Sequence, residues 1–303
     1  MNKAPVLLLT FNRPDLTQQV FNAIRAYIPD RFYIFNDGPR KGNATDAKAR
    51  KDIMEIISHI DWNCDVFRNF SETNQGCGIG VSGAISWAFE HEEKLIILED
   101  DCIPSMNFFM FCNHCLDLYF DDEKIVQVAG NNYTEKHNFT ADDYIIAKYG
   151  HIWGWATWKR AWAKFDYEMT EWPLVRNSSW LSATFADSAE RDYFTEKFDL
   201  YYNDIRRPWA MRWFFARMRS GGLSLIPKIN LVKNIGHIGT HSKMEFKYKV
   251  DLHAALTIRS EPAAVACNTR YDAYHFRYHI NKKSLFYPLR QRMKRLVSLF
   301  KLK

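Results

Sequence analysis

The stretch Lys94-Leu95-Ile96-Ile97-Leu98-Glu99-Asp100-Asp101 decides the fold class of this chain. A short, continuous apolar run is typical of a buried strand in a parallel sheet. The run ends in three consecutive carboxylates, and open α/β sheets bind their ligands at the carboxyl ends of strands. Because adjacent acids repel each other, we expect Mg²⁺ or Mn²⁺ to neutralise them while holding a phosphate. A solvated acidic turn is the alternative interpretation.

Strands and helices alternate around this run. Strands are predicted at 6–9, 32–35, 65–68 and 125–129, and amphipathic helices separate them and follow the acidic run. Repeated strand–helix units with short connections predict a doubly wound sheet. The expected fold class is therefore α/β, with a Rossmann-like, mostly parallel central sheet flanked by helices.

The pattern loosens after residue 130. Strands are expected at 144–147, 223–226 and 229–232, and a helix at 208–219. Trp155, Trp158 and Trp162 have helical spacing, which predicts one buried helical stripe. We therefore divide the chain into a nucleotide-binding half (1–130), an acceptor-binding half (131–250) and a C-terminal extension (251–303).

Polar residues follow three of the predicted strands at the same edge of the sheet. They are Thr10, Asn12 and Arg13 after the first strand, Asn36 and Asp37 after the second, and Glu99, Asp100 and Asp101 after the acidic run. Each alone suits a turn, but together they predict a polar cleft, in which arginine is suited to a diphosphate. The sequence therefore indicates a nucleotide site.

Two further segments are candidates for the site. Trp153-Gly154-Trp155 is placed to form a wall against a sugar ring, and His237, in a late glycine-containing loop, is a candidate ligand for a metal or diphosphate. A loop histidine is otherwise simply solvated. Gly76, Gly78 and Gly80 match no phosphate-loop spacing, so close helix–strand packing is their simpler explanation.

The net charge of +6 is concentrated at the C-terminus. No acidic residue follows Asp272, whereas nine Lys or Arg do. The rest of the chain has 32 basic and 35 acidic residues, and its net charge is therefore about −3. Residues 284–303 are predicted to form a basic amphipathic helix on an anionic membrane surface, or alternatively one docked on the fold. A slightly acidic fold argues against nucleic-acid binding.

The expected location is the cytoplasm, with peripheral contact at the inner face of the plasma membrane. The six cysteines are scattered, no signal peptide is recognisable, and no apolar stretch has the roughly 20 residues that span a bilayer.

These motifs, in this order, resemble GT-A-fold glycosyltransferases over residues 4–242. The closest resemblance is to bacterial family-2-like enzymes and the N-acetylglucosaminyltransferase I type. It rests on Val6-Leu7-Leu8-Leu9-Thr10-Phe11-Asn12-Arg13-Pro14, Asn36-Asp37-Gly38, Leu98-Glu99-Asp100-Asp101, Trp153-Gly154-Trp155 and the segment from Pro227 to His237.

The resemblance implies roles for individual residues. Asp37 would contact the nucleobase, Asp101 would bind the metal, and Glu99 and Asp100 would face the ribose and sugar. One departure concerns the general base, which the N-acetylglucosaminyltransferase I type supplies from a Trp-Asp segment. Here Trp209 is followed by Ala210. Asp204 is the nearest substitute; Glu171 and Asp166 are others.

The predicted activity is metal-dependent transfer of a hexosyl or N-acetylhexosaminyl group from a nucleotide-sugar. UDP is the expected nucleotide, and the acceptor a glycan or lipid-linked sugar in surface polysaccharide synthesis. One alternative is a sugar-phosphate nucleotidyltransferase, although Thr10-Phe11-Asn12-Arg13 lacks its glycine-rich loop. Another is a non-catalytic glycan-binding or scaffold protein on a transferase fold, which Ala210 favours.

Overall fold

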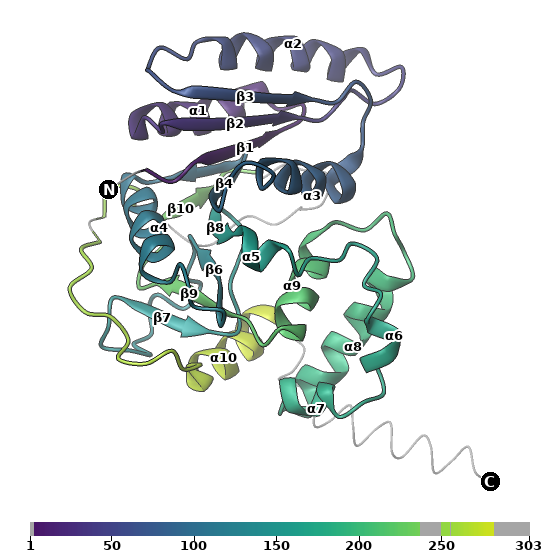
Figure 1. Ribbon diagram of the computed structural model, residues 1–303, viewed down its shortest axis with the longest axis vertical. Coiled ribbons are helices and arrows are strands. Elements are labelled where there is room, and N and C mark those ends of the chain that lie inside the picture. Colours follow the sequence, from purple (N-terminus) through teal and green to yellow (C-terminus); the bar gives the residue numbers. More distant parts are fainter. Residues whose placement is uncertain (1–2, 237–249, 255, 282–303) are drawn as a thin grey trace.

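The computed structural model describes residues 3–236, 250–254 and 256–281. An eight-stranded sheet with the order β3-β2-β1-β4-β8-β6-β9-β7 runs through the molecule, with helices packed around it (Figure 1). β8 and β7 run antiparallel to their neighbours and the other six strands are parallel. The predicted α/β, mostly parallel, Rossmann-like architecture is confirmed.

The first part of the chain is built from strand–helix units. Its elements are β1 (Val6–Thr10), α1 (Pro14–Tyr27), β2 (Arg31–Asn36), α2 (Ala44–Ser58), β3 (Asp65–Phe70), α3 (Gly76–Ala88) and β4 (Lys94–Glu99). Alternate strand residues face opposite sides, so Leu8 and Leu98 pack towards α1, α2 and α4, whereas Leu7 and Ile97 pack towards α3 and α9. Both faces are covered, which explains the continuous apolar runs.

Shorter elements make up the remainder. They are β5 (Cys102–Pro104), α4 (Met106–Leu118), β6 (Ile125–Ala129), β7 (Tyr144–Ala147), β8 (Trp155–Trp158), α5 (Lys159–Trp162), α6 (Trp172–Val175), α7 (Trp180–Thr184), α8 (Ser188–Tyr202), α9 (Ala210–Arg219), β9 (Leu223–Pro227), β10 (Val232–Asn234), α10 (Thr269–His275) and the π-helical turn η1 (Phe276–Ile280). A third hydrophobic cluster joins α8, α9, β7 and α10.

The predicted helical stripe of tryptophans is wrong for residues 155–158. These residues form β8, which lies antiparallel between β4 and β6, and only 159–162 are helical. The three tryptophans are buried as expected. Aromatic residues suit the centre of a sheet, and the open position between β4 and β6 outweighs the helical spacing.

The strand predicted at 229–232 is displaced. The observed β10 covers Val232–Asn234 and pairs with β5 in a separate antiparallel ribbon, not in the main sheet. The three-residue β5 has no sequence signal of its own, because its pairing partner lies about 130 residues away along the chain. This ribbon carries Asn234 to the acidic end of β4.

Two predicted features lie outside the described residues: His237 and the basic helix at 284–303. The expected membrane-surface contact of 284–303 therefore stays a prediction. Within the part of the chain that the structure describes, no helix is long and apolar enough to cross a bilayer.

Candidate functional site

The candidate site lies where the sheet changes direction. β1 pairs in parallel with β2 on one side and with β4 on the other. After β1 the chain adds β2 and β3 on one side of it, and then crosses over to add β4 on its other side. In doubly wound folds ligands bind outside the carboxyl ends of the strands at such a point.

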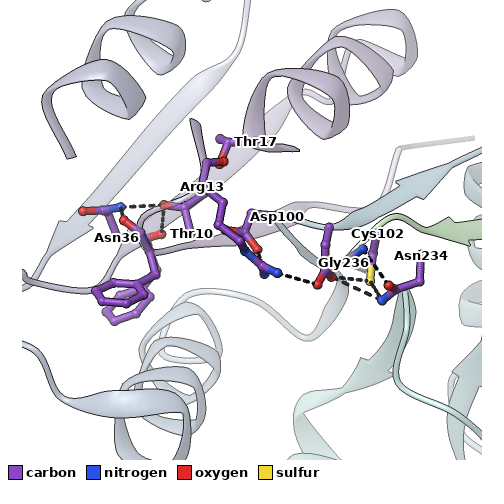
Figure 2. Close-up of polar contacts among 11 residues, drawn as sticks. Thr10, Arg13, Thr17, Asn36, Asp100, Cys102, Asn234 and Gly236 are labelled. Carbon is purple, nitrogen blue, oxygen red and sulfur yellow. Dashed lines mark hydrogen bonds and ion pairs between the residues drawn. The ribbon is translucent and has the colours of Figure 1, made fainter. Parts of the chain in front are cut away.

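Arg13 joins the acidic residues at this edge (Figure 2). Its Nε donates to Asp100 Oδ2 at 3.2 Å and its Nη1 to Asp101 Oδ2 at 2.9 Å, while Nη2 pairs with Asp100 Oδ1. The Arg13 side chain is 28% exposed and that of Asp100 only 4%. The loop after β1 thus supplies a cation that bridges two consecutive carboxylates at the end of β4.

The three acids have different electrostatic environments. Burial, reinforced by the charges of Asp101 and Asp100, raises the pKa of Glu99 to about 8. Burial also raises the pKa of Asp100, to about 6, although the Arg13 guanidinium opposes the shift. At neutral pH Glu99 is therefore largely protonated, whereas Asp100 is largely ionised beside Arg13.

The ribbon strand β10 supports Asp101 from the opposite side. Asn234 Nδ2 donates to Asp101 Oδ1 at 3.4 Å, and the Ile235 amide donates to the Asp101 carbonyl at 2.8 Å. A Cβ added to Gly236 would lie 2.2 Å from Asp101 Oδ2, so only glycine permits this close approach. Asn234 and Gly236 therefore lie beside the acidic cluster. Both are in the segment from Pro227 to His237 on which the resemblance rests, but neither was predicted as a site residue.

The side chains do not form a metal site as they are placed. Among residues 3–236, 250–254 and 256–281, no group of three or more His, Cys, Asp or Glu could hold a metal ion. Instead Arg13 engages both oxygens of Asp100 and one of Asp101. The donor chemistry suits Mg²⁺ or Mn²⁺, but the geometry is that of an ion-pair cluster, and we assign no reaction step to a metal.

The other predicted nucleotide-binding residues near β1 hold the strand ends together. Thr10 Oγ1 donates to the Phe35 carbonyl at 2.8 Å and accepts from Asn36 Nδ2 at 2.9 Å. Asn12 Nδ2 donates to Asp46 Oδ1 at 2.8 Å. The Oδ1 atom of Asn36 is buried, with no hydrogen-bond partner in the described part of the chain. That atom is a free acceptor beside Thr10.

Asp37 organises the loop before α3. Its carboxylate accepts from the amides of Gly38, Gln75 and Gly76 at 2.8, 2.8 and 2.9 Å and from Asn74 Nδ2 at 2.8 Å. With both oxygens engaged and 7% of the residue exposed, Asp37 acts here as the anchor of that loop. The predicted contact with a nucleobase would be made in competition with these four donors.

Two of the three glycines that open α3 are closely packed. A Cβ on Gly78 would lie 2.0 Å from the Tyr167 hydroxyl, and one on Gly80 3.4 Å from the Phe35 ring of β2. Both glycines are buried in α3. Close packing therefore explains Gly78 and Gly80, whereas Gly76 has φ +78° and a Cβ there would meet nothing within 4 Å.

The structure separates the members of the Trp153–Gly154–Trp155 segment. Trp155 is 1% exposed and stacks on Trp209 with ring centroids 5.5 Å apart, so it lies in the core and not in a wall facing a ligand. Gly154 has φ +62°, and a Cβ there would lie 2.7 Å from Val232 Cγ2. Trp153 is partly buried, with its ring 5.5 Å from that of Tyr133. Only Trp153 keeps a surface for an acceptor.

The candidate general bases are all engaged in local contacts. Asp204 accepts from Arg206 Nε at 3.0 Å, and this hydrogen bond holds its pKa below the usual value, which weakens it as a base. Glu171 is paired with Arg219 at 2.7 Å. Asp166 accepts from the Thr170 amide and hydroxyl, both at 2.6 Å. Ala210 stands at the first position of α9 with no carboxylate to offer.

A second group of functional candidates was not predicted. Arg217 and His275 are 1% and 0% exposed, and both line a cavity of about 220 Å³ that Ala210 also lines. In the predicted helix 208–219, Arg217 lies four residues after Trp213 and so on the same face. A cation on this apolar face was the one sequence feature that could have identified Arg217. His275 lies in the C-terminal extension and had no such signal.

His275 is expected to make folding sensitive to mild acid. Burial, together with His151 and His279, lowers its pKa well below the ordinary value, and Arg217 similarly disfavours charge on His151. Below about pH 6.5 the unfolded chain binds a proton there that the native protein does not. The free energy of unfolding of wild type relative to His275→Gln should therefore fall by about 1.4 kcal/mol per pH unit below that point.

Urea unfolding of both proteins from pH 8 to pH 5 measures this difference. Other titrating groups, including Glu99 and Asp100, are present in both proteins and cancel. His59→Gln, which replaces an exposed histidine, is the control for the substitution itself. A constant difference between wild type and His275→Gln would contradict a neutral, buried His275.

Comparison with known proteins yields similarity of structure only. No protein-family model and no curated protein sequence matches the chain. Among solved structures, HddC from Yersinia pseudotuberculosis is 16% identical over 42% of this chain and 57% of its own, with a TM-score of 0.30. The chain thus spans little more than half the length of that protein.

Two other solved structures show comparable similarity. A 4-diphosphocytidyl-2C-methyl-D-erythritol synthase from Anaerococcus prevotii is 12% identical over 66% of this chain and 85% of its own, with a TM-score of 0.32. A UDP-glucose pyrophosphorylase complexed with UDP-glucose is 13% identical over 48% of this chain and 62% of its own, with a TM-score of 0.26. Similarity at this level carries no conclusion about activity.

Proposed function

We propose that this protein is a glycosyltransferase that uses a nucleotide-sugar, with UDP as the expected nucleotide. The group transferred is a hexosyl or N-acetylhexosaminyl unit, and the acceptor is a glycan or lipid-linked sugar of surface polysaccharide synthesis at the cytoplasmic face of the membrane. The observation that carries the proposal is the Arg13–Asp100–Asp101 cluster at the β1/β4 direction change. A cation and two acids at that position suit a diphosphate joined to a sugar.

Arg13 is the residue that we assign to the diphosphate. A guanidinium has five N–H donors. Arg13 uses one from each of its three nitrogens for Asp100 and Asp101, which leaves two for an anionic ligand. Asp100 and Asp101 orient the guanidinium, and Asp101 is exposed enough to meet the ligand. A Mn²⁺ or Mg²⁺ ion at Asp101 stays a prediction, which the addition of EDTA tests.

One observation favours the sugar-phosphate nucleotidyltransferase alternative. The cavity beside Ala210 has no Asp or Glu among the described residues that line it. A sugar hydroxyl needs a general base to become a nucleophile, whereas a sugar phosphate is already an anion. The two activities differ in their products: a glycosyltransferase releases a nucleoside diphosphate, and a nucleotidyltransferase given a nucleoside triphosphate releases pyrophosphate.

A thermal-shift panel is the direct test of nucleotide binding. UDP, GDP, dTDP, CMP and their common sugar conjugates are each added with Mn²⁺ or with EDTA. A ligand at about 100 times its Kd stabilises the native state by about 2.7 kcal/mol. For a chain of this size we expect one nucleotide class to raise the melting temperature by about 5 °C.

Variants of two arginines make the panel specific to the site. Arg13→Gln should remove the shift, whereas Arg25→Gln should keep it, because Arg25 forms an exposed ion pair with Asp61 elsewhere on the surface. A shift that persists in EDTA would exclude the predicted metal requirement for binding. No shift with any nucleotide would reject the proposal and favour the non-catalytic scaffold alternative.

A further inference from the structure

A cavity of about 220 Å³ lies among β6, α8, α9 and the π-helical turn after α10, elements that neighbour one another in the lower half of Figure 1. Its walls are mainly aromatic, from Tyr149, Tyr193, Phe194, Tyr201, Trp213 and Phe214. Among the described residues that line it there is no Asp or Glu, and Arg217 is the one Lys or Arg. We call this cavity the Arg217 pocket.

Arg217 is buried, and none of the acids in the described part of the chain forms an ion pair with it. Its Nη1 donates to the Ser224 hydroxyl, and its Nε has no hydrogen-bond partner among the described residues. Burial lowers its pKa to about 9, so the guanidinium still carries its charge at neutral pH. Asp272 is the acid whose charge acts on Arg217, but its oxygens accept from the amides of Lys148 and Tyr149 and from the Cys267 thiol.

A buried, unpaired cation is unfavourable for folding, since the desolvation of the charge is not repaid by a partner. An anionic ligand bound beside such a cation would offset the free energy lost by its desolvation. Arg217 also packs over the Phe214 ring at 5.5 Å, which fixes the direction of the guanidinium plane. The pocket therefore has the charge and the rigidity of an anion site.

Two neutral histidines complete the polar side of the pocket. His275 Nε2 and His151 Nε2 lie 2.9 Å apart, so one donates and the other accepts. His275 Nδ1 is buried and has no partner in the described part of the chain. Both histidines line the cavity. Two residues that line the pocket, Arg217 of α9 and His275 of α10, thus each carry a buried polar atom with no partner among the described residues.

We infer that the Arg217 pocket binds a small oxyanion, a carboxylate or a phosphate group, carried by a sugar. The guanidinium can hold either group through paired N–H donors, and the aromatic walls suit the apolar face of a sugar ring. Ala210 lines the pocket at the position where the resemblance places a carboxylate, and a carboxylate there would repel an anion. The volume of the pocket is below the roughly 300 Å³ at which pockets for drug-sized ligands begin, so it suits a single sugar unit.

This inference rests on the proposed function, because it makes the oxyanion part of the acceptor sugar. Binding of the acceptor can be measured without a nucleotide, so the two proposals fail separately. A protein that binds UDP but no anionic sugar overturns this inference alone. A protein that binds an anionic sugar but no nucleotide overturns the proposed function.

The test uses calorimetric titration of the full chain with glucuronate, glucose 6-phosphate, inorganic phosphate and glucose at matched ionic strength. We expect glucuronate or glucose 6-phosphate to bind at least about tenfold more tightly than glucose. Preference between the first two assigns carboxylate or phosphate, and comparison with inorganic phosphate shows whether the sugar contributes. Equal affinity for glucose and both anionic sugars would overturn the inference.

Variants tie the binding to the pocket. Arg217→Met should weaken binding of the anionic sugar at least tenfold while melting at or above the wild-type temperature, because it removes an unpaired buried charge. Arg219→Met, on the same helix but paired with Glu171, is the control and should bind normally.

Ala210→Asp gives a second, independent readout. An acid is favourable in the first turn of a helix, so this variant should fold, yet it places a negative charge in the pocket wall. The affinity for the anionic sugar should fall at least tenfold, and the affinity for glucose should be unchanged. Wild-type affinity for the anionic sugar in both Arg217→Met and Ala210→Asp would overturn the inference.

Discussion

Asp101→Asn should lower the rate of sugar transfer, or of nucleotide-sugar hydrolysis, by at least about 100-fold. The substitution keeps the shape of the side chain but removes the charge that accepts from Arg13 Nη1 at 2.9 Å. The guanidinium then keeps only Asp100 as its partner and loses its orientation toward the diphosphate. A preorganised electrostatic contact of this kind typically contributes two to three orders of magnitude to a rate.

Release of the nucleoside diphosphate, with the donor that stabilises the fold best, measures this effect. Asp61→Asn is the matched control, since Asp61 is also paired with an arginine, Arg25, but at an exposed position. Its activity should equal that of wild type, and both variants should melt within a few degrees of it. Activity of Asp101→Asn within twofold of wild type would reject the assignment of this edge as the active site.

Arg212→Met is expected to lower the free energy of unfolding by about 2–4 kcal/mol. Arg212 is fully buried, donates to the carbonyls of Tyr167, Tyr201 and Asp204, and lies over the Tyr167 ring at 4.5 Å. Tyr167 lies between α5 and α6, Tyr201 in the last turn of α8 and Asp204 in the loop after α8. One guanidinium therefore joins these two parts of the chain to α9. Methionine fills the volume but leaves the carbonyls without a donor.

Urea unfolding at pH 7, followed by circular dichroism, measures the loss. Arg219→Met is again the control, because a partly exposed ion pair contributes about 0–1 kcal/mol. Arg217→Met, five residues from Arg212 on α9, should not lose stability, since Arg217 has no array of carbonyls to satisfy. A loss below about 1 kcal/mol for Arg212→Met would show that water replaces the guanidinium.

The parallel half of the fold could be predicted because its signals are local. β1, β2 and β4 contain continuous apolar runs, and the helices of this half have apolar faces of regular period. β8, β5 and β10 could not be predicted in the same way. Residues 155–158 form the strand β8 because they can pair with both β4 and β6. The strand β5 depends on pairing with β10, which lies far along the chain.

The same distinction applies to the candidate site. Arg13 and Glu99–Asp101 follow parallel strands, so their convergence follows from the strand order. The role of Asp37 depends on the backbone amides of Gly38, Gln75 and Gly76, which have no side-chain signal. Arg217 and His275 come from distant helices, and in the sequence a single cation or histidine on a helix resembles a solvated position.

The position of β8 has a consequence for synthesis on the ribosome. β4 and β6 are made before β8, yet each pairs with β8 and not with the other. Until residues 155–158 have left the exit tunnel, the partner of one edge of β4 and of one edge of β6 is therefore missing from the nascent chain. Open edges of apolar strands are templates for misassociation, so we expect chaperone capture to peak at nascent lengths shorter than this point.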